Sequence, residues 1–184
     1  MWIAYLLDPA ESWEVRGRGL PVLLPLSFVL LVGFAFAYYG KEQQFHFSAD
    51  EVAAAQLMYS VAPANTLIIE GARNYPSRYW RYEEFTHVAI SREPAEGIAE
   101  ILEDPAGKMK EWMRNEAYAN ALIIITKSQV AENDLMGSLP IGTLEEIWHD
   151  FAADPDFVTL FSSEDAIVFA LRERIDGLAL EGVL

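Results

Sequence analysis

The sequence predicts an α/β fold: one N-terminal transmembrane helix followed by a three-layer α/β domain with a mostly parallel sheet and an antiparallel C-terminal hairpin. Three observations predict it. Residues 19–39 form an apolar run without a charged residue. After it, strand-like apolar runs alternate with helical segments, as in parallel sheets whose strands are joined by helices. The last two strand-like runs, 157–162 and 166–171, are separated by a short turn that is typical of a hairpin.

The first segment, GLPVLLPLSFVLLVGFAFAYY, has the length and the ends of a membrane-spanning helix. A helix that crosses the hydrocarbon core of a bilayer needs about 20 mostly apolar residues. Arg16 and Arg18 precede the run, and Tyr38 and Tyr39 end it where aromatic residues meet the lipid headgroups. We therefore expect residues 19–39 to span a membrane.

Two other interpretations of this run are weaker. A buried helix of a soluble protein is seldom so apolar over six turns. A cleaved signal peptide would fit the small residues of Ala35-Phe36-Ala37. However, the apolar run exceeds the roughly 7–15 residues of a signal peptide, and the residues before it are not basic overall.

Most acidic residues of the chain lie after residue 39. The net charge is −15, and residues 1–39 hold only three of the 28 acidic and two of the 13 basic residues. The part after residue 39 would therefore repel nucleic acid phosphates, so we expect no nucleic acid partner. Arg16 and Arg18 outnumber Lys41 at the membrane ends, which places the N-terminus in the cytoplasm and the acidic domain outside the cell membrane.

These features divide the chain into five segments. Residues 1–18 are a cytoplasmic lead, or a short loop between two membrane helices if the chain is a fragment of a longer protein. Residues 19–39 are the transmembrane helix, 40–47 a linker, 48–171 the extracytoplasmic α/β domain and 172–184 a tail.

The first half of the domain shows one helix and two strands. Ser48 and Glu51 form a capping box, S-x-x-E, at the start of a helix that continues to about Val61. The β-branched run 66–70 predicts a buried strand, and 85–91 predicts a second one. The loop between them contains arginines and tyrosines, with a short helix expected near Ser77.

The second half contains the clearest strand, 121–126, whose continuous apolar run is typical of a strand covered on both faces. Helices are expected at 94–103, at 108–118 and from 127 toward 139. Another is expected from Thr143, as its N-cap, to about Ala153.

Sequence motifs for catalysis and metal binding are not found. The three histidines have no metal-ligand spacing, and the chain has no cysteine and no phosphate-binding or nucleophile motif. His87 lies within a predicted strand and is expected to be structural. We therefore predict no catalytic residue, no metal site and no cofactor.

The strongest candidate for a ligand site follows the first strand. Ligands of open α/β sheets bind beyond the carboxyl ends of the strands, and arginines beside aromatic residues can hold a phosphate or stack on a sugar. Residue 127 follows the third strand at the same edge. The candidate residues are Arg73, Asn74, Tyr75, Arg78 and Lys127. The alternative, which we favour, is that the aromatic residues pack the domain against the membrane helix while the arginines pair with surplus acidic residues.

The order of several short motifs resembles the C-terminal region of bacterial polytopic glycosyltransferases of the GT-C type. The resemblance extends from about Pro21 to Leu171. The motifs are Tyr38-Tyr39-Gly40, the stretch 47–55, Asn74-Tyr75-Pro76, Tyr82-Glu83, the stretch 125–129 and the stretch 165–171.

The resemblance implies the last membrane helix and the extracytoplasmic domain of an enzyme that transfers sugars from a lipid-phosphate donor. The catalytic acid of such enzymes lies near their N-terminus, so the chain would be an accessory domain, non-catalytic by itself. Its partners would be the lipid bilayer and a lipid-linked sugar or a glycan acceptor. The alternatives are a complete single-pass protein whose outer domain binds a ligand or protein partner, and, less favoured, an independent hydrolase.

Overall fold

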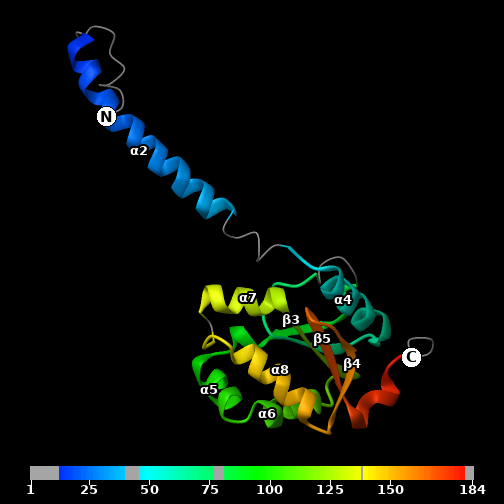
Figure 1. Cartoon of the computed structure of the whole chain (residues 1–184). Coiled ribbons are helices and arrows are strands. Elements are labelled where there is room, and N and C mark those ends of the chain that lie inside the picture. Colours follow the sequence, from blue (N-terminus) through cyan, green and yellow to red (C-terminus); the bar gives the residue numbers. More distant parts are fainter. Residues whose placement is uncertain (1–12, 40–45, 77–80, 138, 181–184) are drawn as a thin grey trace. The chain divides into compact units, whose positions relative to one another are not determined.

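A computed structural model of the chain describes residues 13–39, 46–76, 81–137 and 139–180. The chain divides into two compact units, Met1–Glu42 and Gln43–Leu184. The first unit holds the helix α2, and the second holds the β-sheet and its covering helices (Figure 1).

The helix α2 extends from Trp13 to Tyr39 and contains the whole apolar run. Its 27 residues correspond to a length of about 40 Å. The side chains of α2 are described from Leu24 to Tyr38, and nine large apolar or aromatic ones among them are exposed by 52% to 76%. Among the described residues, no helix is found that is long and apolar enough to cross a membrane.

The second unit is built on a five-stranded mixed sheet with the strand order β2-β1-β3-β5-β4. β1 is parallel to both of its neighbours, β2 and β3, whereas β5 is antiparallel to β3 and to β4. The α/β class and the C-terminal hairpin are thus confirmed. The strands are β1 (Thr66–Glu70), β2 (Thr86–Ala89), β3 (Asn120–Thr126), β4 (Phe157–Ser162) and β5 (Ala166–Leu171).

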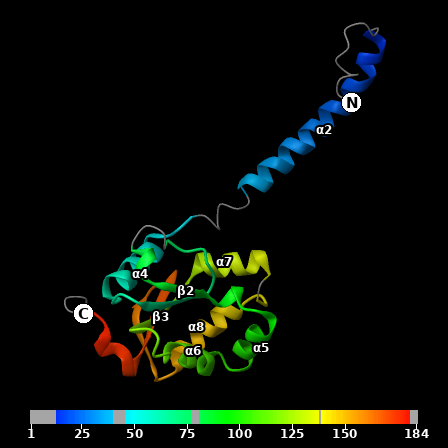
Figure 2. The same cartoon turned by 180° about the vertical axis from the view of Figure 1, so that it is seen from behind.

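Five described helices accompany the sheet (Figures 1 and 2), and the described residues also form three short 3₁₀ segments, the last of which follows β5. The helices are α4 (Ala49–Val61), α5 (Ala95–Glu103), α6 (Pro105–Met113), α7 (Lys127–Met136) and α8 (Thr143–Ala153). The 3₁₀ segments are η1 (Tyr82–Glu84), η2 (Ile90–Arg92) and η3 (Arg172–Gly177).

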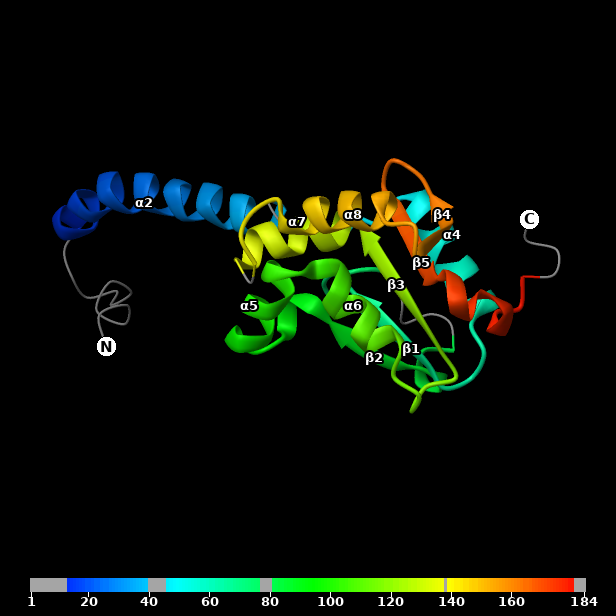
Figure 3. The same ribbon diagram turned by 90° about the horizontal axis from the view of Figure 1, so that it is seen from below.

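Successive side chains of a strand point to opposite faces, so the sheet contributes to two separate cores. Ile69 and Ile123 face the first core, which α5, α6 and α8 complete. Ile68 and Leu122 face the second core, which α4 completes. Helices therefore cover both faces of the sheet, and Figure 3 shows α4 on the other side of the strands from α6.

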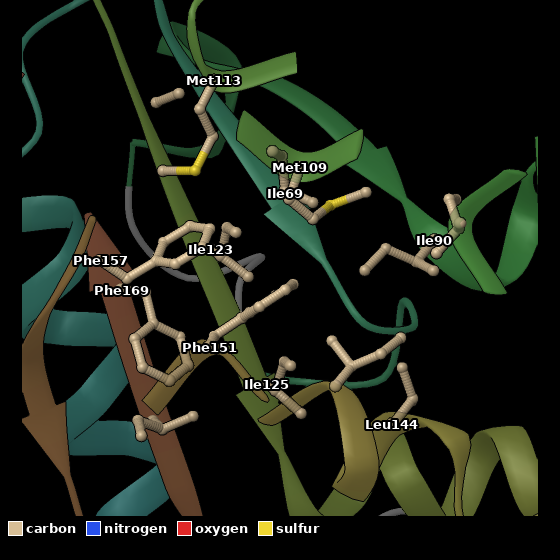
Figure 4. Close-up of a cluster of buried hydrophobic side chains, with 14 of the residues drawn as sticks. Ile69, Ile90, Met109, Met113, Ile123, Ile125, Leu144, Phe151, Phe157 and Phe169 are labelled. Atoms are coloured by element: carbon tan, nitrogen blue, oxygen red, sulfur yellow. The ribbon is translucent and has the colours of Figure 1, made fainter. Parts of the chain in front are cut away.

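Aromatic side chains fill the first core near the hairpin. Phe151 of α8 stacks on Phe157 of β4 with ring centroids 4.8 Å apart, and it meets Phe169 of β5 edge-on at 5.8 Å (Figure 4). Offset and edge-to-face contacts of this kind add to the stabilisation from burial. They fix the C-terminal hairpin against α8.

Three predicted boundaries were wrong for local reasons. The strand expected at 85–91 covers only Thr86–Ala89, because residues 90–92 turn into η2 where the pairing with β1 ends. The helix expected at 108–118 is Pro105–Met113, because the Asp104 carboxylate accepts a hydrogen bond from the Gly107 N–H and caps an earlier start. Thr143 is not an N-cap, since Gly142 takes that position with φ of 84°.

The described residues after the hairpin, 172–180, are packed on the domain. The N–H of Ala179 donates to the carbonyl oxygen of Val61, at the end of α4, and Leu178 is buried in the second core. The short helix expected near Ser77 lies outside the described residues.

Candidate functional site

The predicted site lies where β1 and β3 end. These strands are parallel, with Glu70 paired to Ile124, so their carboxyl ends meet at one edge of the sheet. The chain passes from β1 into the loop 71–76 and from β3 directly into α7. The structure thus brings the two predicted segments together, as the sequence indicated.

The start of α7 is bonded to the loop that follows β1. Thr126 and Gln129 form a capping box, and the Gln129 side chain also donates to the carbonyl oxygen of Ala72 at 2.7 Å. The amide of Asn74 donates to Ser128 O at 3.5 Å, and its backbone N–H donates to Glu132 at 2.9 Å. The loop after β1 and the first turns of α7 are therefore joined by the protein's own polar groups.

A carboxylate of the chain occupies the N-terminus of α7. One oxygen of Glu51 accepts the N–H of Ser128 at 2.7 Å, and the other accepts the N–H of Ser48 at 2.8 Å. Glu51 is only 2% exposed. Helix N-termini attract anions through their unpaired N–H groups and the helix dipole, so Glu51 takes the position that a phosphate would favour.

The predicted site residues differ in their surroundings. Arg73 is exposed, Asn74 is half-buried and Tyr75 is buried, while Arg78 lies outside the described residues. The Lys127 ammonium lies 3.0 Å from the Asp165 carboxylate, whose hydrogen bond raises the pKa of Lys127. The same hydrogen bond lowers the pKa of Asp165.

Sequence reasoning missed a polar cluster beside this edge. The carboxylate of Glu70 accepts the Nδ1–H of His87 at 2.6 Å and the hydroxyl of Tyr75 at 3.0 Å. Because the Tyr75 proton is used in this way, the hydroxyl of Tyr59, 2.9 Å away, donates to the Tyr75 oxygen. Burial, then the charge of Glu70 and the hydroxyl of Tyr59, raises the pKa of Tyr75 well above its ordinary value.

His87 has acceptors on both sides of its ring. Its Nε2 faces the carbonyl oxygen of Tyr82 at 3.2 Å, and the Tyr82 ring stacks on the imidazole at a centroid distance of 3.9 Å. Both ring nitrogens of His87 therefore face oxygen atoms of the protein. The expectation that His87 is a bonded, structural histidine agrees with this geometry.

Strand register could have indicated the Glu70–His87 pair. His87 lies opposite Ile68 in the parallel pairing of β1 with β2, so it shares a face with Glu70, two residues further along. The sequence signal for their contact is a glutamate at the end of one buried strand and a histidine early in the next. This signal applies only if the two strands are assumed to be neighbours in the sheet.

Among the described residues, no group of three or more histidine, aspartate or glutamate side chains could hold a metal ion. Comparison with known protein families, with curated proteins and with solved structures finds no match.

Proposed function

We propose that the chain is a membrane-anchored, extracytoplasmic α/β domain that has an accessory role and is not catalytic by itself. The observation that carries the anchor is the run of residues 19–39, which has no charged side chain and lies entirely within α2. The large apolar side chains described in this helix are exposed, and a bilayer would cover them. Since no spanning helix is found among the described residues, the anchor requires a direct test.

The accessory role is supported by what the polar groups at the sheet edge do. Glu51 holds two backbone N–H groups, Gln129 joins α7 to the loop after β1, and Glu70 is bonded to His87. Each of these side chains stabilises the fold by satisfying a buried partner. None of these contacts requires a substrate.

The wider context we propose is the C-terminal part of a membrane protein similar to lipid-phosphate-sugar-dependent glycosyltransferases. Its support is the order of short sequence motifs from Tyr38-Tyr39-Gly40 to residues 165–171. In this context the domain would cover a membrane-embedded site and contact a lipid-linked sugar or a glycan acceptor.

Extraction of membranes at alkaline pH tests the anchor. We expect the full chain to stay in the membrane pellet at pH 11, because burial of an apolar helix does not depend on charge. A variant with Leu24→Arg and Leu31→Arg should shift to the supernatant, since each arginine costs about 3 kcal/mol at the centre of a membrane helix. Release of the unchanged chain into the supernatant would refute the anchor.

A transfer assay tests the accessory role. The purified full chain is incubated with a lipid-phosphate-linked radioactive sugar and a mixture of glycan acceptors. We expect no transfer above a heat-denatured sample. Transfer that depends on the native chain would show that it is catalytic by itself.

A further inference from the structure

A hollow of about 290 Å³ lies at the opposite edge of the sheet from the predicted site. Its lining residues are Arg114, Asp156, Leu171, Arg172 and Glu173. They come from the end of α6, the turn before β4, the end of β5 and the start of η3, which lie along the lower edge of the domain in Figure 1. Because β5 is antiparallel to β3, this is the edge where the parallel strands begin.

The two arginines of the hollow, Arg114 and Arg172, each donate a hydrogen bond from Nε. The Nε of Arg114 donates to Glu173 at 2.7 Å, and the Nε of Arg172 donates to the carbonyl oxygen of Pro155 at 2.9 Å. No described residue accepts a hydrogen bond from the terminal nitrogens of either guanidinium. Arg174 differs, since both of its terminal nitrogens donate to backbone carbonyl groups. Each guanidinium thus has one Nε contact at an exposed position, while its terminal donors face no described acceptor.

The carboxylates of the hollow already have cationic partners. Asp156 lies 2.7 Å from the ammonium of Lys110, which also contacts Asp154, and Glu173 is paired with Arg114. The charges of this cluster balance, in a chain whose net charge is −15. Its cations are Lys110, Arg114 and Arg172, and its anions are Asp154, Asp156 and Glu173. An anion that enters the hollow thus meets available N–H donors beside two carboxylates whose charges are already balanced by cations.

We propose that this hollow binds a small molecule that carries a terminal oxyanion, either a carboxylate or a phosphate group. Guanidinium groups bind both through paired, charge-assisted hydrogen bonds. Leu171 is buried beneath the hollow, so the ligand is held mainly by its polar contacts. The volume is at the lower limit of ligand pockets, which restricts the ligand to a small one. The proposal does not depend on the membrane anchor.

The test is NMR titration of the ¹⁵N-labelled full chain in detergent micelles, with the side-chain Nε–H signals of Arg114 and Arg172 as the readout. Inorganic phosphate and butyrate are titrated separately, with n-butanol and sodium chloride as controls. We expect saturable shifts with phosphate or butyrate, at a dissociation constant in the millimolar range that is usual for ligands of a few atoms. The anion that binds with the lower dissociation constant, phosphate or butyrate, identifies the class of oxyanion.

Variants establish whether the arginines bind the anion. Arg172→Gln should weaken binding at least about tenfold, because a charge-assisted hydrogen bond is lost. Arg172→Lys, which keeps the charge, should weaken it less, and it replaces Arg172→Gln if that variant does not fold. The matched control is Arg92→Gln, which removes an exposed arginine elsewhere and should leave binding unchanged.

Three results would overturn the proposal. One is that the shifts do not saturate with either anion, even at concentrations about 100 times the millimolar dissociation constant expected of such small ligands. Another is an equal response to sodium chloride, which would show general screening. The third is equal binding by the unchanged chain and the folded Arg172 variants.

Discussion

Replacement of Glu51 by alanine tests how the sheet edge is closed. The Glu51 carboxylate joins the first turn of α4 to the first turn of α7, through hydrogen bonds of 2.8 Å from Ser48 N–H and 2.7 Å from Ser128 N–H. Glu51→Ala removes both acceptors at once. The Ser128 bond is buried, so its N–H would be left without an acceptor.

The expected loss of stability follows from these two bonds. A hydrogen bond to a charged group contributes about 1.5–3 kcal/mol, and a buried donor without a partner costs about 1–3 kcal/mol. Alanine recovers a few tenths of a kcal/mol through its higher helix propensity. We therefore expect Glu51→Ala to lower the free energy of unfolding by about 3–6 kcal/mol. Glu51→Gln keeps one acceptor oxygen and should lose about half as much.

The assay is urea unfolding of the full chain in mild detergent, followed by tryptophan fluorescence. Trp112 and Trp148 pack against the first core, so their emission reports on the α/β domain. The matched control is Glu103→Ala, which removes an exposed glutamate from α5 and should change stability by no more than about 0.5 kcal/mol. If Glu51→Ala costs no more than Glu103→Ala, the carboxylate does not hold the two helices together.

Three further predictions use the same unfolding assay. Glu70→Gln and His87→Ala should each cost about 1–3 kcal/mol, because each leaves a buried polar group without its partner. The double variant should cost less than the sum, and additive losses would contradict the pair. The free energy of unfolding should fall as pH rises above about 10, the pKa of tyrosine in unfolded chains, because the folded protein holds the Tyr75 proton more tightly. Tyr75→Phe should reduce this pH dependence. Equal slopes for the two proteins would exclude Tyr75 as its source. Gly71→Ala should cost about 1–3 kcal/mol, because its methyl group would lie 3.3 Å from side chains of α7 and α8; an unchanged midpoint would show that these side chains move aside.

Local sequence signals predicted much of the fold. The S-x-x-E pattern at Ser48 predicted a capping box, and the structure has both of its hydrogen bonds. Strands with continuous apolar runs, such as 66–70, were placed correctly because burial on both faces leaves a strong signal. The short turn 163–165 also gave the hairpin, since its flanking strands are contiguous in sequence.

Long-range contacts were beyond the sequence. The capping box predicts one bond for Glu51, but its other oxygen bonds Ser128, 77 positions away, and only the folded chain brings them together. The Glu70–His87 pair likewise depends on which strands are neighbours. The edge with the arginine pair combines residues from α6, β5 and η3, none of which forms a motif in sequence.

Topology labelling with a membrane-impermeant maleimide tests the central claim, that residues 19–39 anchor an outer domain, most directly. The chain has no cysteine, so each single-cysteine variant carries one site for the reagent. We predict that Glu164→Cys, at an exposed position of the domain, reacts in intact cells, while Glu14→Cys reacts only after the membrane is permeabilised. Protection of Glu164→Cys in intact cells, with reaction of both variants after lysis, would contradict the outer location of the domain.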